Sequence, residues 1–349
     1  MTPVRVLIID DSATMRRLIQ MRLRSDSRIE VVGEASNTFE AKAAIDILAP
    51  DVLTLDVEMP GQSGLDFLVE MMRKKPMPVI MISSETQRGS TAALEALSRG
   101  AVDCLGKPRV GDSVSAFADL PGLVIAASTA RLLSGRPVPA VPAPAAMRRF
   151  EWSRKIVLIG ASTGGVDALE TIFARMPENC PPTLVTQHMP SGFLAKFAQR
   201  MNARYAPEIR LAENNAPLQQ GTIQIAPGGD FHLCISTGLR QRCLLTASEK
   251  VHGHRPSVDV LFDSARPIAD RIVAVLLTGM GQDGAQGMLN LRRAGAICLA
   301  QDEESSVVWG MPRTAWQNGG AERLVSLNAM AAELLAATEL TMRRDRALP

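Results

Sequence analysis

Short apolar runs that end in polar residues recur along the chain, and segments with helical spacing separate them. In the first third of the chain the runs and the intervening segments alternate at residues 4–9, 15–23, 29–32, 38–48, 52–55, 64–73, 79–82, 90–98 and 101–105. Strands without polar positions are typical of parallel sheets that helices cover on both faces. The alternation therefore predicts a doubly wound parallel α/β sheet.

Residues 134–147 interrupt this pattern. The segment contains four prolines and shows no hydrophobic periodicity, which favours an extended spacer between two domains. We therefore expect a first domain at 3–122, a helix end and Pro/Ala-rich linker at 123–150, and a second domain at 151–344.

The composition excludes several classes of function. Net charge is +2, with 46% hydrophobic and 21% charged residues, and neither a recognition-helix nor a zinc pattern is present. The apolar run at the N-terminus is too short for a signal sequence or a membrane span. The five cysteines form no CxxC pair. We expect a cytoplasmic protein with no nucleic-acid partner and no direct membrane insertion.

Polar side chains stand where the strands of the first domain end. Asp10 and Asp11 end the first run, Asp56 the third, Ser83 the fourth and Lys107 the fifth. Carboxylates that converge at one edge of a sheet repel each other unless a cation joins them, and oxygen ligands suit Mg²⁺. The alternative for each residue is a helix cap or a loop charge.

These residues lie in motifs that resemble the receiver domain of two-component response regulators, over residues 3 to about 122. The matching motifs are the Asp10-Asp11 pair, the segment 55–64 around Asp56, Ser83 in the segment 81–84, and Lys107-Pro108. The resemblance implies a flavodoxin-like (βα)₅ fold in which Asp56 accepts a phosphoryl group from a histidine kinase. It also implies Mg²⁺ held by Asp10, Asp11 and Asp56, support from Ser83 and Lys107, and a cis bond before Pro108.

Three strand–turn–helix units follow the spacer. Their apolar runs lie at 156–159, 183–186 and 272–277, and the turns after them are 160–165, 187–190 and 278–284. Ser162, His188 and Asp283 each stand just past the carboxyl end of a predicted parallel strand. We therefore expect them to meet on one rim of the sheet.

This set of residues suits nucleophilic catalysis. A serine hydroxyl needs a base, which His188 supplies, and Asp283 orients and stabilises the imidazolium. Main-chain amides of the glycine-rich turns, with Thr163 or Met280 as contributors, are placed to hold an oxyanion. The alternative is that the Ser162 turn binds an anion at a helix N-terminus without turnover. His188 and Asp283 have no role in that alternative.

The segment 160–164 fits the Gly-x-Ser-x-Gly elbow of α/β-hydrolases, but the chain order does not fit that fold. Here the order is Ser162, His188, Asp283, whereas α/β-hydrolases place the acid before the histidine. This order predicts a Rossmann-like parallel-sheet hydrolase domain of another type. A dinucleotide site is disfavoured because Ser162 replaces the second glycine of its motif.

Two further histidines lie close together in the sequence. If residues 252–254 form a strand, His252 and His254 lie on one face as a possible metal pair, although no third ligand is identifiable. The following segment, 254–259, is expected to be a structural or substrate-facing loop.

Residues 151–340 resemble the catalytic domain of the chemotaxis protein-glutamate methylesterases. The matching motifs are the segments 160–165, 187–190, 254–259, 277–284 and 310–313. The resemblance implies that Ser162 attacks glutamate methyl esters of methyl-accepting chemoreceptors, without a cofactor, and that receptor glutamines are deamidated. The unmodified first domain is expected to pack over the rim that carries Ser162 and His188. A hydrolase for a different ester and an anion-binding output module without turnover remain as alternatives.

Overall fold

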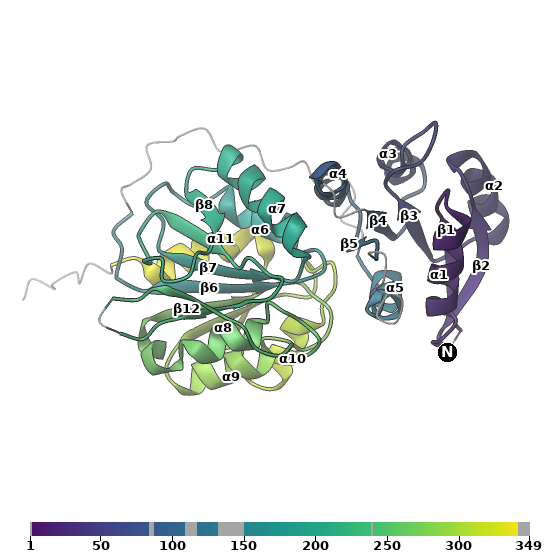
Figure 1. Cartoon of the computed structure of the whole chain (residues 1–349). Coiled ribbons are helices and arrows are strands. Elements are labelled where there is room, and N and C mark those ends of the chain that lie inside the picture. Colours follow the sequence, from purple (N-terminus) through teal and green to yellow (C-terminus); the bar gives the residue numbers. More distant parts are fainter. Residues whose placement is uncertain (1, 84–86, 109–116, 132–149, 239, 341–349) are drawn as a thin grey trace, which may run out of the picture.

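The structure is a computed structural model that describes residues 2–83, 87–108, 117–131, 150–238 and 240–340. Residues 132–149 of the predicted linker and residues 341–344 of the predicted second domain lie outside the described residues. Two α/β units precede and follow the linker (Figure 1). In the part of the chain that is described, no helix has the length and apolar character needed to cross a membrane.

The N-terminal unit is a five-stranded parallel sheet with the order β2-β1-β3-β4-β5. Its elements are β1 (Val4–Ile9), α1 (Ala13–Leu23), β2 (Ile29–Ala35), α2 (Thr38–Leu48), β3 (Val52–Asp56), α3 (Gly64–Lys74), β4 (Val79–Ser83), α4 (Gln87–Ser98), β5 (Asp103–Gly106) and α5 (Leu120–Ser128). Val6 and Ile8 of β1 pack with α1 and α5, whereas Leu7 and Ile9 pack with α2, α3 and α4. The predicted doubly wound (βα)₅ sheet is confirmed.

Local sequence sets the ends of α2. Asn37 caps the helix, since its side chain accepts a hydrogen bond from Glu40 N at 2.9 Å. The Glu40 carboxylate in turn accepts a hydrogen bond at 2.8 Å from the main-chain N–H of Ser36, the residue before the cap. At the other end Ala49 adopts the left-handed conformation directly before Pro50, which cannot continue the helix.

The expected cis bond before Pro108 is wrong. Among the described residues the cis peptide bond is Arg255–Pro256. An X–Pro bond is trans unless its surroundings impose the cis form. The trans bond at Pro108 still brings Lys107 Nζ to 2.8 Å from Asp56 Oδ2.

The C-terminal unit contains a seven-stranded sheet with the order β14-β13-β12-β6-β7-β9-β8, in which every described pairing is parallel, and a separate antiparallel pair of strands, β10 and β11. Its elements are β6 (Ile156–Ala161), α6 (Gly165–Phe173), β7 (Thr183–Gln187), α7 (Ser191–Arg204), β8 (Glu208–Leu211), β9 (Thr222–Ile225), β10 (His232–Ile235), β11 (Cys243–Thr246), α8 (Val258–Ser264), the short 3₁₀ helix η1 (Arg266–Arg271), β12 (Ile272–Leu276), α9 (Ala285–Arg293), β13 (Ile297–Gln301), α10 (Met311–Gln317), β14 (Arg323–Val325) and α11 (Leu327–Thr338). Helices α6, α7 and α11 cover one face, and α8, α9 and α10 cover the other (Figure 1). The predicted parallel-sheet domain is confirmed.

The strand order creates a crevice between β6 and β12. From β6 the chain proceeds to β7 on one side, and later strands β12, β13 and β14 extend the sheet on the other side. Helices therefore leave the two neighbouring strands in opposite directions, and the carboxyl ends of such strands are where ligands bind in open α/β sheets. Ser162 follows β6, and the turn that carries Asp283 follows β12.

Candidate active site

Ser162 lies on a turn that is tied to both central strands. Its N–H donates to the Thr278 carbonyl at 3.0 Å, and its own carbonyl accepts from Gly165 N at 2.7 Å. A Cβ atom at Gly279 would lie 2.7 Å from the Ser162 Cβ, so only glycine permits this close approach. The turn thus holds Ser162, which is 9% exposed, at the N-terminus of α6.

His188 and Asp283 form a buried pair. His188 Nε2 lies 2.8 Å from Asp283 Oδ2. Asp283 also accepts hydrogen bonds from Ser257 Oγ at 2.8 Å, Val258 N at 2.7 Å and Asp259 N at 3.1 Å. Burial alone would raise the pKa of Asp283, but His188 and these donors lower it to about 2. The carboxylate is therefore ionised and fixed beside the imidazole.

The segment 254–259 thereby has a specific role that the sequence did not reveal. Its Ser257, Val258 and Asp259 supply three of the donors to Asp283, and two of these are main-chain N–H groups at the start of α8. Asp283 therefore interacts with the positive end of a helix from a different part of the chain. The expected structural loop is an anchor for the carboxylate.

The second nitrogen of His188 is the one left for Ser162. Nε2 binds Asp283, whereas His188 Nδ1 is buried and has no hydrogen-bond partner among the described residues. The same described residues include no hydrogen bond between Ser162 Oγ and His188. Bonds between a nucleophile and its base are often long without substrate. The structure therefore joins His188 and Asp283 by a hydrogen bond. Ser162 lies at the end of the neighbouring strand β6.

Gln187 connects the two strand ends. Its Nε2 donates to the Ser162 carbonyl at 2.9 Å and to the His188 carbonyl at 3.0 Å, and the residue is 2% exposed. One side-chain amide thus fixes the spacing between the two main-chain segments. Sequence reasoning missed this residue, although a polar side chain at the last position of an apolar strand was a usable signal.

Thr163 and Met280 lie where the two domains meet. No hydrogen-bond partner is recorded for the main-chain N–H of either residue within the described part of the chain. The Thr163 hydroxyl donates to the Asp103 carboxylate of β5. The Met280 side chain packs against α5, where a Cβ at Gly122 would lie 3.2 Å from it. The predicted oxyanion residues therefore retain free amides but lie against the first domain.

The first domain covers the Ser162 turn. A pocket beside Ser162 is lined by residues of both domains, among them Leu97, Ala101 and Asp103 from the first and Ser162 and Gln187 from the second. Burial in this pocket raises the pKa of Asp103 to about 6. Helix α4 packs against α6 and α7 from the same side.

Two hydrogen bonds reinforce this arrangement of the domains. Arg200 of α7 donates to the Leu94 carbonyl of α4 at 3.0 Å, and Arg131 N donates to the Val307 carbonyl at 3.1 Å. In Figure 1, α4 and the edge strand β5 are the elements of the first domain that lie nearest the second domain. The expectation that the first domain packs over the Ser162 rim matches this arrangement.

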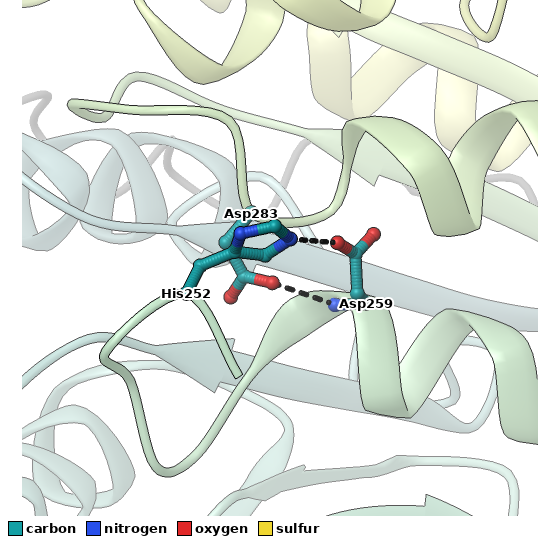
Figure 2. Close-up of side chains that lie close together, drawn as sticks. All are labelled: His252, Asp259 and Asp283. Atoms are coloured by element: carbon teal, nitrogen blue, oxygen red, sulfur yellow. Dashed lines mark hydrogen bonds and ion pairs between the residues drawn. The ribbon is translucent and has the colours of Figure 1, made fainter. Parts of the chain in front are cut away.

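The expected strand at 252–254 is wrong, because these residues form a tight turn. Val251 and His254 exchange two main-chain hydrogen bonds, and His252 and Gly253 have φ values of 51° and 82°. His252 lies 3.1 Å from an Asp259 carboxylate oxygen, beside Asp283 (Figure 2). The His254 ring instead stacks on His188. The two imidazoles therefore serve different neighbours and do not form a metal pair.

The carboxylates around His252 already bind protein donors. Ligand atoms of His252, Asp259 and Asp283 lie within 4.8 Å of one another. Asp283 accepts four hydrogen bonds from the protein, and Asp259 accepts from Gly287 N at 2.6 Å. We assign this group to the positioning of Asp283 (Figure 2).

The acidic residues of the first domain converge as expected. Ligand oxygens of Asp10, Asp11 and Asp56 lie within 4.8 Å of one another, and Lys107 Nζ lies 2.8 Å from Asp56 Oδ2 and 3.3 Å from Asp10 Oδ2. Burial raises the pKa of Asp56, and Lys107 opposes this shift. Ser83 is buried at the end of the adjacent strand, where its carbonyl accepts from Lys107 N at 2.7 Å.

Known families and proteins match both units. The CheB methylesterase family model matches residues 157–334, and the response regulator receiver domain model matches residues 6–116. A protein-glutamate methylesterase/protein-glutamine glutaminase 1 of Rhizobium johnstonii is 50% identical over 96% of this chain and 97% of its own length. A protein of the same activities from Agrobacterium fabrum is 49% identical over 98% of both chains. The crystal structure of the Thermotoga maritima CheB methylesterase catalytic domain covers 52% of this chain and 97% of its own, at 36% identity and a TM-score of 0.51.

Proposed function

Since the chain belongs to the CheB methylesterase family, we propose that it hydrolyses glutamate methyl esters of chemoreceptors and deamidates receptor glutamines, in chemotaxis adaptation. The observation that carries this proposal is the buried His188–Asp283 pair beside Ser162 at the crevice between β6 and β12. We place the protein in the cytoplasm, where the kinase and the receptor helices are accessible to it.

The residues act in a sequence of proton transfers. Ser162 Oγ attacks the ester carbonyl carbon while His188 takes the hydroxyl proton, and Asp283 stabilises the imidazolium. The main-chain N–H groups of Thr163 and Met280 hold the oxyanion, a role for which their lack of other partners suits them. His188 then returns the proton to the leaving oxygen, which releases methanol. Water attacks the acyl-enzyme by the same route and frees the glutamate, with no metal or cofactor.

The receiver domain implies phosphorylation by a phosphodonor kinase, and we propose Asp56 as the acceptor. Mg²⁺ fits between Asp10, Asp11 and Asp56, because their ligand oxygens lie within 4.8 Å of one another, and the buried Oδ2 atoms of Asp10 and Asp56 pair with the Lys107 ammonium and with no other donor among the described residues. When bound, the metal neutralises charge on the transferring phosphoryl group. Lys107 and Ser83 are placed to bind the added oxygens.

Replacing Asp56 with asparagine is expected to prevent phosphorylation, because the amide cannot form an acyl phosphate. Incubation of the full chain with radiolabelled acetyl phosphate and Mg²⁺ measures the incorporation. Wild-type protein should be labelled and D56N should not, and chelation of Mg²⁺ should abolish labelling of the wild type. Equal labelling of D56N would place the acceptor elsewhere.

We further propose that the unphosphorylated receiver restricts access to Ser162. The pocket beside Ser162 is closed on one side by Leu97 and Asp103, and the Asp103 carboxylate binds the Thr163 hydroxyl. A receptor helix cannot reach Ser162 while these contacts persist. Phosphorylation of Asp56 would weaken them through the adjoining β4 and β5 strands.

Removing the receiver is expected to raise the basal rate of methanol release. A fragment of residues 151–349 should exceed the unphosphorylated full chain by roughly tenfold, the effect of losing a gate of about 1.4 kcal/mol. Asp103→Ala in the full chain should recover part of this increase, since it removes the contact between the domains at Thr163 and, within the first domain, one hydrogen bond from Cys104 N. Equal rates for the full chain, D103A and the fragment would contradict the gate.

A further inference from the structure

His254 packs face to face against His188, and the proposed reaction gives it no role. The two ring centroids are 3.8 Å apart and the ring planes differ by 10°. We propose that His254 is a positioning residue that holds the His188 imidazole flat against its own ring during proton transfer. This inference rests on the proposed function because it concerns the same base.

The main chain holds His254 firmly in this place. His254 N donates to the Val251 carbonyl at 2.9 Å, and Val251 N donates back to the His254 carbonyl at 3.1 Å. The turn between them is anchored by His252, whose ring contacts Asp259 at 3.1 Å (Figure 2). The His254 ring therefore provides a fixed surface that the His188 ring lies against.

A fixed surface is needed because one hydrogen bond does not determine the orientation of a ring. The bond from Nε2 to Asp283 fixes one edge of the His188 imidazole and leaves the ring free to tilt about that edge. Nδ1, the nitrogen left for Ser162, lies off that edge and moves with the tilt. Stacking against His254 restricts this motion, and stacked aromatic pairs are favourable beyond their buried area.

The charge state of His254 suits this role. Burial and, to a lesser degree, the charge of His188 lower the pKa of His254 to about 4, and Asp283 opposes the shift. His254 is therefore neutral near pH 7. Among the described residues, Asp283 and, from the receiver, Asp103 act electrostatically on His188, whereas His252 and Lys250 act on His254. A neutral ring against the imidazolium is attractive, whereas a second cation there would repel it.

Two substitutions of His254 by side chains of similar size test whether the planar ring itself, or only the volume of the side chain, is required. His254→Phe keeps a planar surface, and His254→Leu does not. The readout is the rate at which a fluorophosphonate labels Ser162 in the full chain, measured from pH 5 to pH 9. We expect H254L to react about tenfold more slowly than the wild type. We also expect the acid limb of its pH–rate profile, where labelling declines as the pH falls, to lie at lower pH than in the wild type, because the His188 imidazolium loses its aromatic partner. We expect H254F to stay within about twofold of wild type, with its acid limb unmoved.

The outcomes that overturn the inference are distinct from failure of the proposed function. Wild-type labelling by H254L with an unmoved acid limb, or equal slowing of H254F and H254L, overturns the role of the ring. A general loss of folding would lower the rate without moving the limb, and thermal unfolding of each variant checks for it. If H254L does not fold, His254→Gln replaces it. The fluorophosphonate requires no receptor, so wild-type protein that is labelled but releases no methanol overturns the proposed function alone.

Discussion

Replacing Ser162 with alanine is expected to lower methanol release from methylated receptor membranes by about 10⁵-fold to 10⁶-fold. The variant lacks the only atom that can form the acyl-enzyme in the proposed mechanism, while its backbone bonds to Thr278 and Gly165 remain possible. The loss should therefore appear in turnover and not in folding. Gas chromatography of methanol, with and without a phosphodonor, measures it.

The control is phosphorylation of Asp56, which lies in the other domain and should be unchanged in S162A. Retained methanol release in this variant would rule out Ser162 as the nucleophile. The same experiment with wild-type protein separates the alternatives. Labelling of Ser162 by a fluorophosphonate without methanol release would indicate a hydrolase for a different ester. Neither labelling nor release would indicate an anion-binding module.

Both sheets could be predicted from the sequence because the pattern that indicates a buried strand lies within a few consecutive residues. A strand that is buried on both faces is an apolar run, as at 156–159 and 272–276, and its burial is confirmed. A polar residue directly after such a run lies at the carboxyl edge in any parallel sheet. This rule predicts Asp56 beside Asp10 and Asp283 near His188, and the contacts of these residues agree with it.

The supporting contacts could not be predicted because they join segments that are distant in sequence. The N–H groups of Val258 and Asp259 bind Asp283 only because α8 begins beside the turn after β12. Nothing in the spacing of these residues encodes that approach. Likewise, the bond between Asp103 and Thr163 depends on how two separately folded domains dock.

The error at 252–254 has a physical origin. Alternating histidines lie on one face only if the backbone is extended. Gly253 has a φ of 82°, a conformation that glycine adopts without steric cost, and it turns the chain so that His252 and His254 diverge. Gly253, between the two histidines, therefore indicated a turn and not a strand, and a turn is what the structure contains.

Replacing Asp283 with asparagine is expected to lower turnover by about 10⁴-fold, the effect of losing the acid that orients a catalytic histidine. An asparagine amide can present its NH₂ group to His188, which then adopts the wrong tautomer. It also carries no charge to stabilise the imidazolium. Because the pKa of Asp283 is about 2 and the ordinary value is 3.8, the wild-type pair persists above about pH 4 and is lost only as the pH falls toward 2. Protonation of Asp283 should therefore not limit wild-type activity above about pH 4.

Asp259→Asn provides a matched comparison for this variant. Asp259 is a neighbouring buried carboxylate that binds Asp283 through its main-chain N–H, which the substitution preserves. Its side chain contacts His252 and Gly287 N and does not contact His188. D259N should therefore lose far less turnover than D283N, although both variants lose one buried negative charge near the start of α8. A similar loss in the two variants would mean that the charge of this region, and not the contact between Asp283 and His188, supports the reaction. Steady-state methanol release and thermal unfolding of both variants, measured in parallel, decide between these explanations.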